Sequence, residues 1–533
     1  MKFNRRVFFV RVVVLLCALI GLFFSKRQMM EVEENVEHIT VEPSSGEVVI
    51  DFSQLREQPP IALDVPFPQG AIQDEMVVHF SNRQDYLGYL KALADAGMAP
   101  LGQIDKLLVV RVGAEAMFGP NPGRYGGQGS FSYRVERPLP PVEVAPELYA
   151  QLQTFSQSAR SIVGGLIDGD GSGVKVGILD SGIKPHPQFD DAYIVHSDLV
   201  GRGVAGPGAA HGTAVASIVA GSEGIAPAAE LFVVRVLDDQ GLGNSFHVAE
   251  GIVQAVDLGV KVLNLSLGVY QESQLLREAV RYAHAHNVIM VAAAGNDGYT
   301  QMPYPAAYPE VLAVTAVDGL GNQALFPNQS AQIDFAAPGV GVIAAQGDEG
   351  TGLFSGTSAA APFVSGTLAS ILSASEVGTA QQAVDLMKRY LDDAGAPGVD
   401  PVYGAGLVNW DRLRERGTAA VHDIALADVF LSPEALPGTT VPVEVTVQNR
   451  GTSWLTSAML SVLVGEGDVV DFTIGTLGPG HTTTRKVYTQ LPSEGSAEAL
   501  SIAAQVLPEE SIADVRLDNN LKVVLFRPRQ PLQ

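Results

Sequence analysis

Apolar runs and amphipathic stretches alternate along the middle of this chain. Helical periodicity appears around Phe246–Leu258 and Gln274–His286. The intervening runs are almost wholly apolar, which is typical of parallel strands covered on both faces. These runs are Val174–Leu179, Leu231–Val234, Val260–Leu265 and Val288–Ala292. The alternation predicts an α/β fold with a parallel sheet flanked by helices, in which functional side chains lie at the carboxyl ends of strands.

A smaller pattern precedes this region. Ser81 and Gln84 have the spacing of a capping box, apolar residues then recur at helical spacing, and Gly97 provides a stop. Three runs around this helix have strand character: Met76–Phe80, Leu107–Val112 and Phe131–Val135. Residues 74–145 are therefore predicted to form a small α+β unit.

After Gly417, apolar residues recur at every second position. Val441, Val443, Val445 and Val447 alternate with polar residues, as in a half-buried strand. Four further short strands are predicted at Leu460–Val464, Arg485–Tyr488, Ile502–Val506 and Lys522–Phe526. This pattern favours an all-β Ig-like sandwich over residues 420–533.

The chain begins with a basic segment followed by an apolar run over residues 7–24, which Arg11 interrupts. The run suits either a cleaved signal peptide or a retained membrane anchor within residues 1–27, and both interpretations stay open. Either one predicts export of the following chain, because positive charge precedes the run. Residues 28–73 are acidic, contain proline and show weak periodicity, so we expect a linker.

Composition limits the kinds of partner and the kinds of metal site that we expect for this chain. The 533 residues include 34 Lys and Arg against 58 Asp and Glu, a formal net charge of −24. Such a surface repels polyanions, so nucleic acid is not an expected partner. Cys17 is the only cysteine and lies in the apolar leader. The folded part therefore forms no internal disulfide and no cysteine-ligated metal site.

Three polar residues within two positions of a glycine carry the candidate chemistry, in the chain order Asp180, His211, Ser358. A serine hydroxyl needs a base to take its proton during attack, and imidazole titrates near pH 6.5. A carboxylate can hold the second imidazole nitrogen and fix its tautomer. The order separates this chain from esterases of the α/β-hydrolase kind, in which Ser precedes Asp and His. It is the order of subtilisin.

The local contexts are Leu179-Asp180-Ser181-Gly182, His211-Gly212-Thr213 and Gly356-Thr357-Ser358-Ala359. They resemble those of the subtilisin-like serine peptidases, the subtilases, over roughly Val174–Trp410. The resemblance implies a subtilisin-like peptidase domain over residues 146–417 and an acyl-enzyme on Ser358. It also implies that Asn296, in Ala294-Gly295-Asn296, donates to the oxyanion.

The same resemblance implies a peptide-binding site. Its residues would be Ser266, Leu267 and Gly268 on one wall and Ala293, Ala294 and Gly295 on the other. An extended substrate would add to this site as a strand. Catalysis would need no cofactor and no metal is assigned, although subtilases often bind structural calcium, whose ligands this sequence does not identify.

The flanking regions resemble known families more loosely. By position and pattern, residues 74–145 resemble the subtilase propeptide, a folding template and temporary inhibitor; a permanent structural domain is the alternative. The strand end Val447-Gln448-Asn449-Arg450-Gly451 and the closing Asp518-Asn519-Asn520 resemble a CARDB-type adhesion domain, which implies an adhesion partner.

The sequence therefore predicts an exported serine endopeptidase acting on polypeptides, with membrane association through residues 7–24 if the leader is kept. The alternative is an adhesion or binding protein that uses an inactive subtilase fold as a scaffold. That alternative predicts a broken triad, and the triad here is whole.

Overall fold

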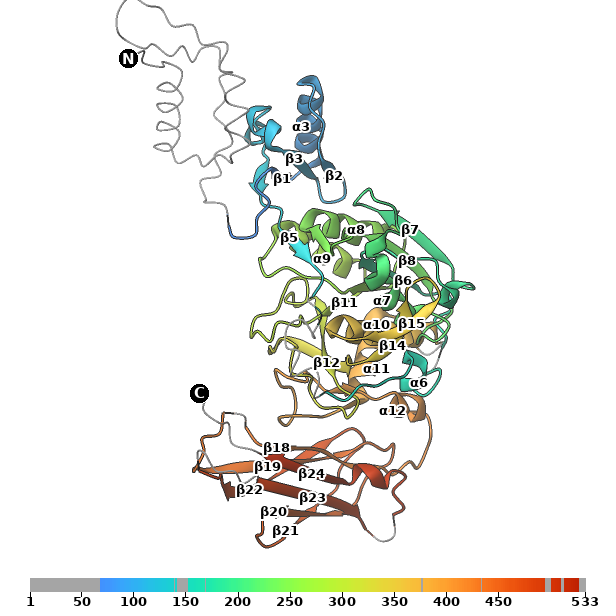
Figure 1. The fold of residues 1–533 in the computed structure, drawn as a ribbon, viewed down its shortest axis with the longest axis vertical. Coiled ribbons are helices and arrows are strands. Elements are labelled where there is room, and N and C mark those ends of the chain that lie inside the picture. The colour runs from blue at the N-terminus through green and yellow to red at the C-terminus, as the bar shows by residue number, and fades with distance from the viewer. Residues whose placement is uncertain are drawn as a thin grey trace, which may run out of the picture. The chain divides into compact units, whose positions relative to one another are not determined.

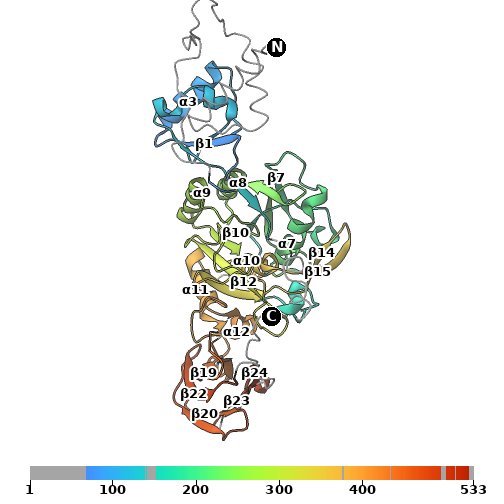
Figure 2. The same cartoon turned by 60° about the vertical axis from the view of Figure 1, so that its left-hand side comes forward.

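The computed structural model describes residues 68–138, 140, 152–167, 169–374, 377–432, 434–493, 500–509 and 512–526. The leader and most of the linker predicted above lie outside these residues. No helix in the described part of the chain is long and apolar enough to cross a membrane. Figures 1 and 2 show an N-terminal α+β unit, a central α/β domain and a C-terminal β domain.

The central domain is built on a nine-stranded sheet with the order β16-β17-β13-β12-β11-β10-β6-β8-β7. All neighbouring strands are parallel except β16 and β17. The predicted α/β fold and its four apolar strands are confirmed. The strands are β6 (Lys175–Asp180), β7 (Ile194–Asp198), β8 (Glu230–Arg235), β10 (Val262–Leu265), β11 (Ile289–Ala293), β12 (Val311–Val317), β13 (Ile333–Pro338), β16 (Leu391–Asp392) and β17 (Leu407–Val408).

Helices cover both faces of this sheet (Figure 1). Successive residues of β6 show the two layers, since Ile178 and Leu179 are both fully buried but belong to separate apolar clusters. The Ile178 cluster includes α7 (Ala210–Ala220) and α10 (Thr357–Ser373), and the Leu179 cluster includes α8 (Ser245–Asp257) and α9 (Gln274–Ala285). Smaller elements are α6 (Ala159–Ile162), α11 (Ala380–Arg389), α12 (Trp410–Glu415) and the hairpin β14 (Val342–Gln346)–β15 (Gly350–Phe354).

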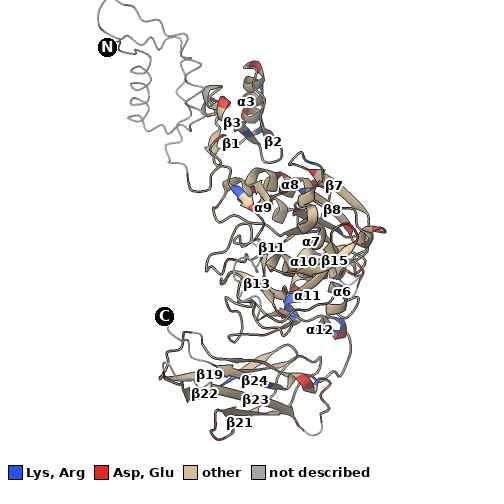
Figure 3. Ribbon diagram, viewed as in Figure 1, with Lys and Arg blue, Asp and Glu red and all other residues tan. Residues whose placement is uncertain are grey.

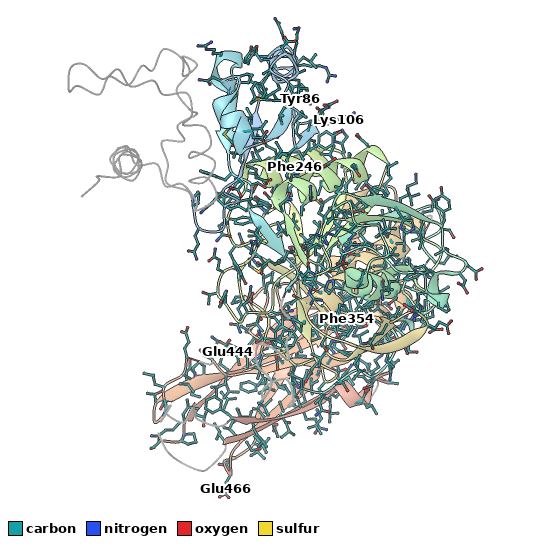
Figure 4. The ribbon with its side chains drawn as sticks, turned by 45° about the horizontal axis from the view of Figure 1, so that its top comes forward. Tyr86, Lys106, Phe246, Phe354, Glu444 and Glu466 are labelled. Carbon is teal, nitrogen blue, oxygen red and sulfur yellow. The ribbon has the colours of Figure 1, made fainter. Side chains whose placement is uncertain are left out.

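The N-terminal unit, as far as the structure describes it, is an antiparallel sheet of order β2-β3-β1-β4 with one α-helix. Its cap differs from our prediction: Asn82, not Ser81, is the N-cap, because its extended backbone lets the side chain accept from Asp85 N at 2.9 Å. Tyr86, labelled in Figure 4, is fully buried in this unit. Its elements are β1 (Glu75–His79), α3 (Arg83–Asp95), β2 (Gly102–Ile104), β3 (Val109–Gly113) and β4 (Gln128–Ser130).

The third strand predicted for this unit is placed differently. Strand β5 (Arg134–Glu136) overlaps the predicted run, but it pairs antiparallel with β9 (Leu242–Asn244) of the peptidase domain. Strand propensity is a local property, whereas the partner of a strand is chosen by tertiary packing.

The C-terminal domain has two antiparallel sheets, β18-β19-β22 and β21-β20-β23-β24. Val443, Val445 and Val447 are fully buried, which confirms the predicted sandwich, but the predicted period of two fails towards the end of β19, where Thr446 and Gln448 are buried as well. The strands are β18 (Ile424–Phe430), β19 (Thr440–Asn449), β20 (Ala458–Val464), β21 (Val470–Ile474), β22 (Thr482–Gln490), β23 (Leu500–Pro508) and β24 (Leu521–Phe526).

Candidate active site

A buried carboxylate–imidazole pair lies at the carboxyl edge of the central sheet. Asp180 ends β6 and is fully buried, and its Oδ1 also accepts from Ser181 N at 2.7 Å. The two carboxylate oxygens lie 2.8 and 3.0 Å from Nδ1 of His211, the second residue of α7. An ionised carboxylate only accepts hydrogen bonds, so Nδ1 carries the proton and Nε2 is left as the basic nitrogen.

Gly212, directly after His211, allows the contact between Asp180 and His211 to form. A Cβ on Gly212 would lie 2.1 Å from the carbonyl oxygen of Gly182 and 3.2 Å from Oδ1 of Asp180. Only glycine therefore lets the first turn of α7 approach the end of β6 this closely. Gly212 is therefore needed for packing, in addition to being part of the His-Gly motif.

Ser358 is the second residue of α10 and is 2% exposed. Gly356 caps this helix with φ of 123°, a region that favours glycine, and a Cβ there would lie 2.9 Å from Nδ2 of Asn296. The positive end of the helix dipole thus lies beside the hydroxyl.

The hydroxyl oxygen of Ser358 is buried without a hydrogen-bond partner among the described residues, so no bond joins it to His211. Such bonds commonly tighten only when substrate binds. The His211 ring has an edge-on contact with Phe354, which ends β15 and is labelled in Figure 4; the ring centroids are 5.4 Å apart. This contact covers one side of the imidazole.

Asn296 is oriented by a residue that the sequence reasoning did not single out. Its Oδ1 accepts from both the backbone N and Oγ1 of Thr357, each at 2.9 Å. Thr357 Oγ1 in turn accepts from Gly295 N at 3.1 Å. Because a backbone N–H must meet an acceptor, this network fixes Oδ1 toward Thr357 and the amide group toward Gly356. The signal in the sequence was a threonine directly before the candidate nucleophile.

The residues predicted for one substrate wall follow β10. Ser266 Oγ lies 3.4 Å from the backbone oxygen of Ser358, and Leu267 and Gly268 come next in the chain. A buried chain of bonds supports this contact: Ser365 Oγ donates to Asn264 Oδ1 at 2.9 Å, and Asn264 Nδ2 donates to Ser266 Oγ at 3.0 Å. A polar Asn264 inside an apolar strand was the overlooked signal, because a buried amide needs partners.

The other predicted wall, Ala293, Ala294 and Gly295, ends β11 and continues into the loop of Asn296. Both alanines are fully buried. Asn328, also missed, holds the chain beyond Asn296, because its Oδ1 accepts from Asp297 N at 3.2 Å and from Tyr299 N at 3.0 Å. In the described part of the chain, no group of three or more His, Asp or Glu side chains could hold a metal ion.

This fold and this set of side chains are typical of an α/β serine hydrolase. The sequence profile of the subtilase family matches residues 171–406, and the CARDB profile matches residues 424–524.

Subtilisin BL and subtilisin Savinase, both from Lederbergia lenta, are each 37% identical over 245 residues, which cover 45% of this chain and 90% of the relative. The minor extracellular protease Epr of Bacillus subtilis (strain 168) is 32% identical over 249 residues, which cover 45% of this chain and 38% of that protein. A solved structure of the prenylagaramide maturation protease PagA is 29% identical, with a TM-score of 0.42 over 48% of this chain and 97% of that one. The chain belongs to the subtilase family and is a serine-type endopeptidase with polypeptide substrates.

Proposed function

We propose that Asp180, His211 and Ser358 form the catalytic triad of this endopeptidase. The observation that carries the proposal is the 2.8 Å contact between a fully buried carboxylate and Nδ1 of His211. Nε2 of His211 takes the proton of Ser358 as its oxygen attacks the scissile carbonyl, and then gives that proton to the leaving amine. Water attacks the acyl-enzyme by the same route and releases the acid product.

The tetrahedral oxyanion is assigned to two donors. The backbone N–H of Ser358 opens α10, and the amide of Asn296 is held in place through its bonds from Thr357. Donors that are fixed before the reaction stabilise charge without paying for reorientation during it. Ser266, Leu267, Gly268, Ala293, Ala294 and Gly295 are the residues proposed to line the peptide groove.

The N-terminal unit is proposed to act as a propeptide. It contacts the helices of the peptidase domain: His79 Nδ1 lies 2.9 Å from Glu278 of α9, and the Arg111 guanidinium lies 4.9 Å from the Phe246 ring on α8 (Figure 4). Tyr133 and Ser245 add two hydrogen bonds of 2.8 and 3.0 Å. A unit that covers these helices can template their packing, which a freely tethered domain could not do.

Export and a role for the sandwich complete the proposal. The apolar run over residues 7–24 would direct the chain across a membrane, as a cleaved signal or as an anchor. The similarity to a relative named as extracellular supports this. The CARDB-like domain at 420–533 would bind an adhesion partner. No cofactor is assigned to catalysis, and structural calcium stays unassigned to any residue.

A fluorophosphonate probe tests the triad directly. The full chain should be labelled covalently, the Ser358→Ala chain should not, and turnover of a peptide substrate should fall by about 10⁴ or more in that variant. Ser373→Ala is the matched control, because Ser373 lies at the other end of the same helix. Equal labelling of the Ser358→Ala and unsubstituted chains would contradict the assignment.

A further inference from the structure

The start of the helix that carries His211 is fixed by a side chain from another part of the chain. Helix α7 has no side-chain cap of its own, because its N-cap residue is Ala209. Asp239, in the loop after β8, supplies the missing acceptor: its Oδ1 accepts from Gly208 N at 3.0 Å. Gly208 lies three residues before His211, so this bond acts close to the proposed catalytic base.

The two segments approach each other closely at this bond. A Cβ on Gly208 would lie 2.3 Å from Cα of Asp239, which is a backbone atom and cannot move aside alone. A larger residue at position 208 would therefore displace the start of α7 from Asp239.

Asp239 is held in turn by Arg235, which ends β8 and is fully buried. Nη2 of Arg235 donates to Asp239 Oδ1 at 2.7 Å, Nε donates to Leu237 O at 3.2 Å, and Nη1 donates to Gly203 O. A buried guanidinium needs such partners, because an unpaired charge in the interior is costly. The N–H of Gly208, and then the Arg235 guanidinium, lower the pKa of Asp239 below its ordinary value, so the carboxylate stays ionised at neutral pH.

The segment Arg235–Asp239 also bonds to the strand that ends in Asp180. Strands β6 and β8 are parallel neighbours, and Val236 N and Leu237 N both donate to the backbone oxygen of Asp180, at 2.8 and 3.2 Å. One short segment therefore bonds to Asp180 through its backbone and to the start of α7 through the side chain of Asp239.

This connection bears on the direction of the His211 ring. The contact with Asp180 fixes Nδ1, whereas the direction of Nε2 also depends on where α7 places the Cα atom of His211. The proposed proton transfer needs Nε2 to face Ser358 Oγ. Because a misplacement of about 1 Å in such a site can cost about 10²-fold in rate, the start of α7 has to be fixed relative to Asp180.

We propose that Asp239 is a positioning residue for the proposed catalytic base, and that Arg235 keeps Asp239 in place. Both residues act through the backbone of α7 and the turn before it, rather than on the substrate. The proposal rests on the assignment of Asp180, His211 and Ser358 to catalysis. Loss of the bond to Gly208 N lets the start of α7 shift, which slows the chemical step and leaves peptide binding largely unchanged.

Substitutions of Asp239 in the full chain test the proposal. Asp239→Ala removes the acceptor of Gly208 N and should lower kcat for an added peptide at least about tenfold, while KM changes by less than about threefold. Asp239→Asn keeps an oxygen acceptor and should recover kcat to within about threefold of the unsubstituted chain. The rate at which a fluorophosphonate probe labels Ser358 should follow the same order, because it reports the nucleophile without peptide binding.

Two further variants separate positioning from a general loss of stability. Thr379→Ala is the matched control, because Thr379 caps α11 by accepting from Gln382 N at 3.2 Å. It should lower the melting temperature, as the loss of a helix cap does, and leave kcat unchanged at a temperature at which every variant is folded. Arg235→Lys keeps the charge without the fork of donors, and should lower kcat with no further fall when combined with Asp239→Ala.

The outcomes distinguish this proposal from the triad itself. A kcat for Asp239→Ala within about threefold of the unsubstituted chain would overturn it, and so would an Asp239→Asn chain as slow as Asp239→Ala. An equal fall in kcat for Thr379→Ala would reduce the effect to stability alone. Additive falls for Arg235→Lys and Asp239→Ala would overturn the role of Arg235. Labelling that is absent from every variant, or that survives Ser358→Ala, would instead contradict the proposed catalytic residues.

Discussion

The two regions that flank the peptidase domain are attached to it in different ways. The N-terminal unit contributes strand β5, which pairs through its backbone with β9 and with Gly268 of the peptidase domain. The C-terminal sandwich instead bonds to β16 at the end of the central sheet. Gln448 Nε2 donates to Leu391 O at 3.1 Å, and Arg450 lies 3.2 Å from Asp392.

The junction with the sandwich is polar and buried. Gln448 is 3% exposed and also accepts from Asp393 N at 3.2 Å, and the Arg412 guanidinium lies 3.1 Å from Asp392. Figure 3 shows the basic positions of α11 and α12, the helices that adjoin this part of the chain. Buried polar groups are costly to separate, because each would lose its partner.

The difference teaches which attachment can regulate activity. The backbone hydrogen bonds of β5 could equally be made by another extended peptide, so this strand can be exchanged. A junction of specific side-chain bonds away from the groove contributes to stability and has no substrate to compete with. Changes on the groove side should therefore alter turnover, and changes on the junction side should alter unfolding.

Removal of the proposed oxyanion donor should give the largest effect on the groove side. Asn296→Ala should lower kcat by about 10²–10³ with little change in KM, because the amide acts on the transition state. Steady-state kinetics of the Asn296→Ala chain beside the unsubstituted chain would measure this. A kcat within threefold of the unsubstituted chain would show that Asn296 does not face the oxyanion.

Peptide preference should follow strand β5, which pairs with Gly268 of the proposed groove. Val135 is the fully buried residue of this strand, so substrates with Val at the equivalent position should be cut about tenfold faster than those with Asp. Two peptides that differ only there give the ratio of kcat/KM. Equal values would mean that the site of Val135 does not receive substrate side chains.

Loss of a junction bond should change stability and leave turnover alone. Gln448→Ala leaves Asp393 N unpaired and removes one of the two side-chain donors to Leu391 O, the other being Arg412, at a cost of about 1–3 kcal/mol in the free energy of unfolding. Gln505→Ala, an exposed position of β23, is the control and should stay within about 0.5 kcal/mol. A fall in kcat for Gln448→Ala, measured at a temperature at which the variant is folded, would show that the junction affects turnover as well as stability.

Acidic residues near this junction predict a smaller, pH-dependent effect. Burial, and then repulsion from Asp400 and Asp428, raises the pKa of Asp393 from 3.8 to about 6. The folded state thus holds a proton that the unfolded state has already lost, so stability from this group is present below pH 4 and falls as pH rises through about 6.

Asp393→Asn keeps an acceptor for Gly398 N and removes the titration. The difference in melting temperature between the Asn variant and the unsubstituted chain should therefore grow from pH 4 to pH 7. A difference that stays constant over this range would assign the titration to other groups, such as Asp400.

Much of the fold was predictable because the signals were local. The apolar runs of β6, β8, β10 and β11 and the valines of β19 depend on neighbours in the chain, and each formed as expected. The cap at Asn82 was missed by one residue, since Ser and Asn are equally good caps and only the backbone angles choose between them. The roles of Thr357, Asn264 and Asn328 were not predicted, because the hydrogen-bond partners that define these roles lie far away in the chain.

The sequence by itself determined the chemical groups, their order and the strand and helix character of each segment, because those properties depend on side chains and their nearest neighbours. Only the tertiary structure decided that β5 leaves its own unit to pair with β9 and Gly268, more than a hundred positions away. The reason is physical: an extended segment satisfies its backbone equally well beside any free edge, so packing of buried side chains such as Val135 makes the choice.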